Sequence, residues 1–376
     1  MKRRKEQTMA DIETRTVTLL EAQTRITRAF KKKRPAFLWG PPGVGKSELM
    51  EQIATSGDLG NTLLMDLRVA LMEPTDLRGM PFYNADSGKM EWAPPVDLPS
   101  EEIAKEYDTV ILFLDEMNSA APAVQAAAYQ LVLNRRVGTY KLPDNVVMVA
   151  AGNRDTDKGV TYRMPTPLAN RFVHLEIRPD FESWLTWAVD NKISEDVIGY
   201  LSFAKGDLFD FDPRASGRSF ATPRSWTFVS EFLDDEIDDN ELTDLVAGCV
   251  GEGIAIKFAA HRKIANDMPM PADILSGKVK ELKVKEISAQ YALTIGMCYE
   301  LRDAFDKFGK KDSKKWHGMA DNFIRFMMDF FPTEMTVMGA RVAINNYKLP
   351  MDPNKLSNFK EFFDRFGKYV ISAVED

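Results

Sequence analysis

One stretch of sequence decides the fold: Gly40-Pro41-Pro42-Gly43-Val44-Gly45-Lys46-Ser47. It matches the pattern G-x-x-x-x-G-K-[ST], whose glycines let backbone N–H groups turn inward around phosphates. The apolar run Ala36–Trp39 precedes it and an amphipathic stretch follows it, so the expected order of strand, loop and helix is present. The dipole of the following helix favours the same anion. A glycine-rich turn is the alternative. We predict that this stretch binds a nucleotide, that Lys46 reaches the β- and γ-phosphates and that the Ser47 hydroxyl ligates Mg²⁺.

A second motif ends in two acids. Five apolar residues, Val110–Leu114, lead directly into Asp115 and Glu116. This pattern predicts a buried strand that delivers both carboxylates at its carboxyl end, where ligands bind in open α/β sheets. We expect Asp115 to hold the Mg²⁺ shell and Glu116 to polarise the attacking water. Such a strand means little alone, but after a phosphate loop it indicates nucleotide hydrolysis.

Three further polar residues complete the candidate site. Asn153 follows the apolar run Val146–Ala151 and is expected to orient the water, although a loop-forming asparagine is the alternative. Arg171 comes immediately before the last expected strand. Arg224 follows a Thr-Pro pair that is typical of the first residues of a helix. Each arginine in isolation is more typical of an ordinary surface residue, and Arg163 is a weaker third candidate.

The chain is organised as an α/β part followed by a helical part. Near-continuous apolar runs that alternate with helices are typical of a parallel sheet covered on both faces. The expected strands are 36–39, 62–66, 109–115, 146–151 and 172–177. The expected domains are a flexible 1–16, a nucleotide-binding 17–180 with insert hairpins at about 79–95 and 135–145, a helical lid 181–265 and a helical C-terminal domain 266–376. We also expect single helices over 17–30 and 242–260.

Composition narrows the class of partner. The chain has 376 residues with 49 Lys and Arg against 56 Asp and Glu, a net charge of −7. An acidic body argues against broad contact with a phosphate backbone, although the basic segment Lys31–Arg34 leaves a local nucleic-acid contact open. No apolar run approaches the ~18 residues of a membrane span, and the polar N-terminus lacks a signal sequence. Two cysteines and three histidines predict neither a disulfide framework nor a metal site, so we expect a cytoplasmic protein.

The order of these parts resembles an AAA+ ATPase, and finer features resemble its MoxR-type, dynein-related branch. The segments that carry the finer resemblance are Leu38–Gly43 in the phosphate loop, Pro74–Gly79 before an insert, and Arg136–Pro143 as a hairpin ahead of the third motif. The resemblance covers roughly residues 17–265. Asn170 departs from the pattern, because many relatives have Asp before the arginine that Arg171 matches.

The resemblance implies a P-loop α/β core with a five-stranded parallel sheet in the order 5-1-4-3-2, followed by an α-helical lid. It implies Mg²⁺-dependent ATP hydrolysis at the subunit interfaces of a ring, most often a hexamer. Arg171 then becomes the arginine finger for a neighbouring subunit, Asn153 becomes sensor 1 and Arg224 becomes sensor 2. Relatives commonly remodel partner proteins, including proteins with a von Willebrand factor A domain. A nucleic-acid motor and a nucleotide-dependent scaffold are the alternatives.

Overall fold

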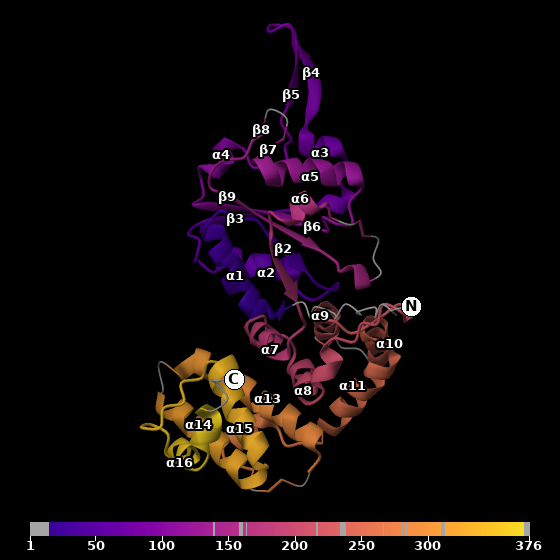
Figure 1. Ribbon diagram of the computed structural model, residues 1–376. Helices are drawn as coiled ribbons and strands as arrows, with labels where there is room; N and C mark the ends of the chain where they lie inside the picture. The colour runs from indigo at the N-terminus through magenta and orange to yellow at the C-terminus, as the bar shows by residue number, and fades with distance from the viewer. Residues whose placement is uncertain are drawn as a thin grey trace, which may run out of the picture. The chain divides into compact units, whose positions relative to one another are not determined.

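A parallel sheet of six strands forms the centre of the N-terminal part of the chain, in the order β1-β10-β2-β9-β6-β3 (Figure 1). The structure is a computed structural model that describes residues 15–371, except 138–139, 158–160, 163, 216, 234–237, 266, 280, 283–284 and 310–312. The strands are β1 Thr16–Val17, β2 Ala36–Trp39, β3 Thr62–Arg68, β6 Thr109–Asp115, β9 Val146–Gly152 and β10 Val173–Ile177.

Both faces of this sheet are buried, which explains its continuous apolar strands. In β6, Ile111 and Phe113 contribute to one apolar cluster, whereas Leu112 and Leu114 contribute to another. Helices α1 (Leu19–Lys31) and α2 (Lys46–Thr55) cover the first face. Helices α3 (Pro74–Arg78), α4 (Glu101–Ala104) and α5 (Pro122–Asn134) cover the second (Figure 1). The sheet is therefore enclosed, and its strand ends are the places where polar residues reach solvent.

The predicted sheet of five strands is wrong, because β1 adds a sixth at the edge beside β10. Within the sheet the five expected strands do follow the order 5-1-4-3-2. Thr18 explains the difference: its side chain and that of Glu21 form a reciprocal cap, so α1 begins at Leu19 rather than at Val17. Thr16 and Val17 are thereby left extended and pair with Glu176 and Ile177.

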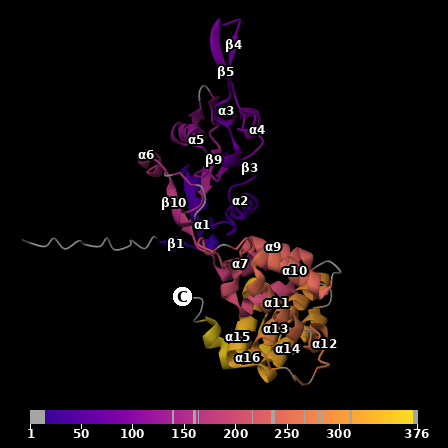
Figure 2. The ribbon, with the colours of Figure 1, turned by 90° about the vertical axis from the view of Figure 1, so that its right-hand side faces the viewer.

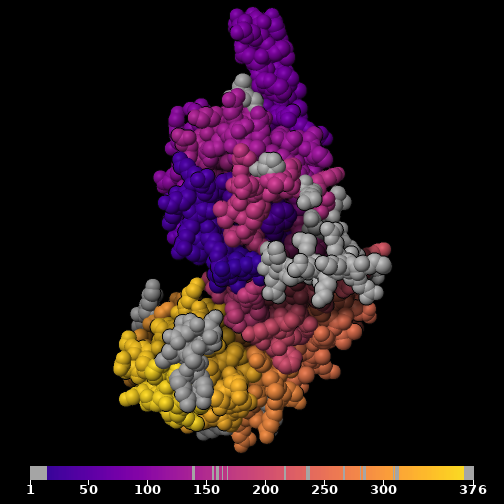
Figure 3. All heavy atoms as spheres, in the orientation of Figure 1, coloured from indigo at the N-terminus to yellow at the C-terminus, as the bar shows by residue number. Residues whose placement is uncertain are grey.

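Two antiparallel hairpins interrupt the α/β pattern. Strands β4 (Met80–Asn84) and β5 (Lys89–Ala93) form a hairpin that projects beyond α3 and α5 in both views (Figures 1 and 2). Figure 3 shows it as a narrow projection at one end of the first unit. Gly79 starts it with φ 81°, and a Cβ there would lie 1.9 Å from the Ala93 carbonyl oxygen, so only glycine fits. The second hairpin joins β7 (Arg136–Val137) and β8 (Tyr140–Lys141).

The chain divides into two compact units, Met1–Asp180 and Phe181–Asp376. The described part of the second unit is helical. Its α-helices are α7 Phe181–Asp190, α8 Glu195–Phe203, α9 Pro223–Phe232, α10 Asp239–Val250, α11 Glu252–Ala265, α12 Pro271–Leu275, α13 Ile287–Ala304, α14 Ser313–Phe330, α15 Thr333–Arg341 and α16 Ser357–Ile371. Short 3₁₀ or π turns cover Lys205–Leu208, Phe305–Gly309 and Val342–Asn346.

One apolar core runs through the second unit, from Trp184 to Phe362. The expected boundary between a lid and a C-terminal domain at 265/266 passes through this shared core. The single helix expected over 242–260 is wrong, because Gly251 has φ 94° and separates α10 from α11. Across the residues that the structure describes, we find no helix with the length and apolarity of a membrane span.

Candidate functional site

The phosphate-loop stretch connects β2 to the first turn of α2, as its sequence pattern requires. Gly43 and Gly45 have φ values of 73° and 100°, a backbone region that residues with a Cβ rarely adopt. Gly45 is the N-cap of α2, and no side chain caps that helix. The first N–H groups of a helix have no partner inside it, so this helix start is suited to an anion.

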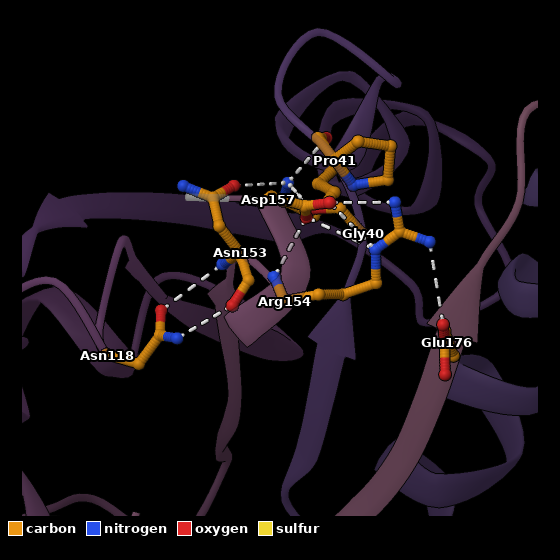
Figure 4. A network of polar contacts seen from close by, with 8 residues as sticks. Gly40, Pro41, Asn118, Asn153, Arg154, Asp157 and Glu176 are labelled. Atoms are coloured by element: carbon orange, nitrogen blue, oxygen red, sulfur yellow. Dashed lines mark hydrogen bonds and ion pairs between the residues drawn. The ribbon is translucent and has the colours of Figure 1, made fainter. Parts of the chain in front are cut away.

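Lys46 joins the loop to the end of β9. Its Nζ donates hydrogen bonds to the carbonyl oxygens of Gly40 at 2.8 Å and Pro41 at 3.0 Å, and to Asn153 Oδ1 at 3.4 Å. Figure 4 shows Gly40 and Pro41, which are adjacent in the loop, close to Asn153 after the end of β9. The ammonium group is therefore held at the loop by exchangeable oxygen partners, which phosphate oxygens can replace.

Ser47 and Asp115 meet at the ends of α2 and β6. Ser47 Oγ donates to Asp115 Oδ2 at 3.1 Å, while Asp115 Oδ1 accepts from the backbone N–H of Glu116 at 2.8 Å. A hydroxyl and a carboxylate are oxygen ligands of the kind that Mg²⁺ takes, with water filling its other positions. Partial desolvation and the neighbouring charge of Asp115 raise the pKa of Asp66 in β3, although Arg68 opposes the shift. A cation between these strand ends would relieve that repulsion, so the residues fit Mg²⁺.

Glu116 has an unusual backbone. It adopts φ 54°, which is uncommon for a residue with a side chain and costs of order 1–3 kcal/mol. Its carbonyl oxygen accepts from the Ser119 N–H at 2.9 Å, so the chain turns sharply after the strand. The Glu116 side chain is exposed. The turn therefore presents a carboxylate to solvent directly beside Asp115.

Asn153 follows β9, and a second asparagine that the sequence analysis did not single out binds its backbone. Asn118 Nδ2 donates to the Asn153 carbonyl at 2.7 Å, and the Asn153 N–H donates to Asn118 Oδ1 at 3.2 Å (Figure 4). The signal for Asn118 in the sequence is a polar amide two residues after the acidic pair Asp115 and Glu116. Since its partner is a backbone group 35 residues away, the sequence pattern does not reveal the contact.

Arg154 is a further basic residue that the sequence analysis missed. Its guanidinium binds the buried Asp157 through Nε at 3.1 Å and Nη2 at 2.8 Å, and Nη1 lies 3.6 Å from Glu176 Oε1 (Figure 4). Hydrogen bonding to Asp157 raises the pKa of Arg154. Its charge is thus compensated within this unit, and the pair anchors the segment after Asn153 to β10.

Arg171 follows α6 (Thr166–Ala169) and is exposed. A histidine links its segment to the strand before the phosphate loop. Trp39 Nε1 donates to His174 Nδ1 at 2.9 Å, and His174 Nε2 lies 2.7 Å from the Ala169 carbonyl oxygen. With Nδ1 accepting and Nε2 donating, the contacts assign a neutral imidazole.

Two candidate arginines remain. Arg224 belongs to the second unit, where it is exposed in the first turn of α9 behind a cap formed by Thr222 and Ser225. Arg163 lies outside the described residues. The structure thus brings together Lys46, Ser47, Asp115 and Asn153 within the first unit, and the geometry of the site rests on that unit alone.

Residues 35–172 match the family model described as the AAA domain, dynein-related subfamily. This region includes the phosphate loop, both acids, Asn153 and Arg171. The chain is similar to midasin of Giardia intestinalis, with 27% identity over 205 residues that cover 50% of this chain. It spans 4% of the length of that relative.

The chain is also similar to two solved structures at low sequence identity. A putative ATPase from Cytophaga hutchinsonii has a TM-score of 0.34 and 15% identity, over 76% of this chain and 75% of that chain. NtrX from Brucella abortus in complex with ATP has a TM-score of 0.36 and 14% identity, over 87% of this chain and 65% of that chain.

Proposed function

We propose that this protein binds Mg²⁺ and ATP at the phosphate loop and hydrolyses the nucleotide to remodel or activate a partner protein. The observation that carries the proposal is the contact of Ser47 Oγ with Asp115 Oδ2 at 3.1 Å, beside Lys46 and the exposed Glu116. Together these residues supply a phosphate cradle, two metal ligands and a carboxylate for the attacking water. The match to the AAA domain supports the same chemistry.

Each residue has a defined part in the proposed reaction. Backbone N–H groups of the loop bind the phosphates, and Lys46 exchanges its carbonyl partners for phosphate oxygens. Ser47 and Asp115 would hold Mg²⁺, which would supply positive charge at the phosphates. Glu116 accepts the proton of the attacking water, and Asn153 orients that water. Catalysis then consists of positioning and charge stabilisation, with little covalent chemistry by the protein.

We further propose that the complete site forms between copies of the chain in a ring, with six as the expected number. Arg171 is exposed after α6, and it is proposed to reach the nucleotide of a neighbouring copy as an arginine finger. Arg224 in the first turn of α9 is proposed as sensor 2, and residues 181–265 as the lid. Residues 266–376 are proposed to dock a partner. We also propose that residues 17–265 belong to the MoxR-type branch.

The β4–β5 hairpin supports a protein as the partner. Its large apolar side chains are exposed rather than packed onto their own domain; Tyr83, for example, is 65% exposed. The exposed residues are Met80, Phe82, Tyr83, Met90 and Trp92. Exposed aromatic and methionine side chains on a projecting hairpin suit a protein surface, and a partner with a von Willebrand factor A domain is one candidate. The net charge of −7 disfavours a nucleic-acid backbone.

A nucleic-acid motor is the second candidate. Lys31–Arg34 are all exposed at the end of α1, which gives the first unit a local basic surface. Phosphate contacts at this segment predict affinity for duplex or single-stranded DNA that falls steeply with salt. Salt-independent or absent binding of DNA by the full chain would remove this candidate.

The test uses Glu116→Gln, which should retain nucleotide, as bait in a lysate of the native host with Mg²⁺ and ATP. A stoichiometric protein that survives nuclease treatment and is absent when ATP is omitted supports remodelling. Lys46→Ala is the matched control, because it should capture nothing under the same conditions. Capture that nuclease abolishes would instead support the nucleic-acid motor.

A further inference from the structure

We propose that Asn118 is a positioning residue that fixes Asn153 relative to Asp115 and Glu116. This inference rests on the proposed hydrolysis of ATP and adds a residue that the sequence motifs do not include. The residues concerned lie where the β6–β9 pairing ends. The last residues paired between these two strands are Leu114 and Ala150, although β9 continues to pair with β2 as far as Gly152.

Beyond that point the Asn118 side chain continues the pairing. The Met117 N–H first donates to the Ala151 carbonyl at 2.9 Å. The Asn118 carboxamide then exchanges two hydrogen bonds with Asn153, giving through Nδ2 and accepting through Oδ1 (Figure 4). A carboxamide carries the same donor and acceptor as a peptide group. Asn118 thus replaces a strand residue where the backbone has already turned away.

The Asn118 side chain is held in one orientation by its surroundings. The residue is 3% exposed, and its own carbonyl oxygen accepts from the Tyr162 N–H at 2.7 Å and from Gln125 Nε2 at 3.4 Å. A Cβ on Gly152 would lie 2.2 Å from Asn118 Oδ1. The backbone of Gly152 is not in the left-handed region, so its conformation does not require glycine. Glycine is required at position 152 because a larger residue would leave no room for the Asn118 amide.

This arrangement links the two residues proposed to act on the attacking water. Glu116 lies two residues before Asn118, and the Asn153 side chain accepts from Lys46 Nζ at 3.4 Å. Loss of the Asn118 amide leaves the Asn153 N–H and carbonyl without these partners, so the end of β9 is freed to shift. A misplacement of about 1 Å can cost about 10²-fold in rate. We expect hydrolysis to fall about 10- to 100-fold while nucleotide affinity changes less than threefold.

Asn145 offers a matched control at the opposite end of the same strand. It precedes β9, and its Nδ2 donates to the carbonyl oxygens of Ala104 at 2.7 Å and Tyr107 at 2.9 Å. Asn145 therefore also ties a loop to the sheet through an amide and two carbonyl groups. It does so at the amino end of β9, whereas the phosphate loop lies at the carboxyl end. Asn145→Ala should lower stability without a selective loss of turnover.

The experiment compares Asn118→Ala, Asn118→Asp and Asn145→Ala in the full chain. Asn118→Asp keeps the size of the side chain but cannot donate to the Asn153 carbonyl when ionised. Three quantities are measured for each: hydrogen exchange of the Asn153 amide, the Kd for ATP, and kcat. Asn118→Ala removes the acceptor of the Asn153 N–H and should exchange that amide about tenfold faster, whereas Asn118→Asp keeps an acceptor oxygen there. Both variants lose the donation to the Asn153 carbonyl, so both should lose turnover at nearly unchanged Kd. Asn145→Ala should show neither change.

Unchanged exchange at Asn153 in Asn118→Ala would overturn the inference, as would equal losses of turnover in Asn118→Ala and Asn145→Ala. If Asn118→Ala does not fold, Gly152→Ala, which pushes against Asn118 Oδ1, supplies the exchange readout and Asn118→Asp supplies the turnover readout. Absence of ATP hydrolysis in the unaltered protein would contradict the proposed function, while the exchange measurement would still decide the positioning role.

Discussion

The two units differ in how many of their buried polar atoms are unpaired: among the described residues the first unit leaves Arg25 Nη1 without a hydrogen-bond partner, whereas the second leaves several such atoms in its core. At the strand ends of the first unit, polar side chains bind one another or backbone groups, as Lys46, Asp115 and Asn118 illustrate. In the core of the second unit, several buried polar atoms have no hydrogen-bond partner among the described residues: Trp184 Nε1, both His261 ring nitrogens, Gln290 Oε1 and Tyr347 Oη. The first arrangement fixes the residues of the proposed site, whereas apolar packing holds the second unit together despite its polar atoms.

This contrast predicts different consequences of substitution. Changes at the strand ends of the first unit should alter nucleotide binding or turnover with little effect on folding. Changes to buried polar groups of the second unit should alter its stability and leave the chemistry of the first unit intact. A substitution in the first unit that altered stability alone, or one in the second unit that altered turnover, would contradict this difference.

Lys46→Ala should have the largest effect, because it removes the cation expected to contact the β- and γ-phosphates. Charge-assisted hydrogen bonds to phosphate are among the strongest in proteins. We expect ATP binding to fall at least about a hundredfold in a titration with labelled nucleotide, with unchanged thermal unfolding. Lys105→Ala, at an exposed lysine after α4, is the control and should bind normally. Binding of Lys46→Ala within threefold of normal would contradict the proposed site.

Arg171→Ala should spare ATP binding and lower kcat by about 10³–10⁵, the usual contribution of an arginine finger. If the arginine acts on a neighbouring copy, mixing Arg171→Ala with Lys46→Ala chains should restore part of the activity, because each supplies what the other lacks. Arg178→Ala, at an exposed arginine near Asp180, is the matched control. Normal turnover by Arg171→Ala alone would refute the assignment in trans.

Glu116→Gln should bind Mg²⁺ and ATP with normal affinity and lower kcat by about 10²–10⁴, as expected for loss of a general base. The glutamine also relieves negative charge beside Asp115, so the affinity for ATP should not fall. Single-turnover hydrolysis measured alongside nucleotide binding separates these effects. Glu102→Gln, on the exposed side of α4, should hydrolyse normally. A weakened Kd with normal kcat would instead assign Glu116 to binding.

The sequence predicted the parts of the first unit that depend on local patterns. The phosphate loop needs glycines at Gly43 and Gly45, and a strand buried on both faces needs an unbroken apolar run such as Val110–Leu114. Strand β1 was missed because two residues pair through their backbone and leave no pattern of side chains. Asn118 and Asp157 were missed because burial and contact with the end of β9 give them their roles.

The second unit was predicted less completely. Helical periodicity located most of its helices, but Gly251 inside an apolar stretch did not signal the break that its φ of 94° imposes. Nor did the sequence show that one core joins α7 to α16, because such packing depends on pairs such as Gly199 and Ala292, distant in sequence. The buried state of His261 has the same origin.

The smallest expected effect is a pH-dependent loss of stability that comes from His261. This histidine in α11 is 4% exposed, packed between the rings of Tyr200 and Phe203, and burial lowers its pKa to about 4, although Asp196 opposes the shift. The usual value is 6.5. The folded protein binds this proton less readily than the unfolded chain does. The contribution of His261 to the free energy of unfolding is therefore constant above pH 6.5 and is lost as the pH falls toward 4. We expect a loss of about 2–3 kcal/mol across that range.

Urea unfolding of the full chain at pH 7.5 and pH 4.5 measures this loss, and His261→Leu, which has no titrating group at this position, should reduce it. Glu195, whose burial raises its pKa, is present in both proteins, so their difference isolates the histidine. His317→Leu in α14 is the control and should keep the full pH dependence. Equal pH dependence of the His261→Leu protein and the unaltered protein would show that the second unit accommodates the charged imidazole. Buried polar groups there would then be as well compensated as those at the strand ends, and the contrast between the two units would fail.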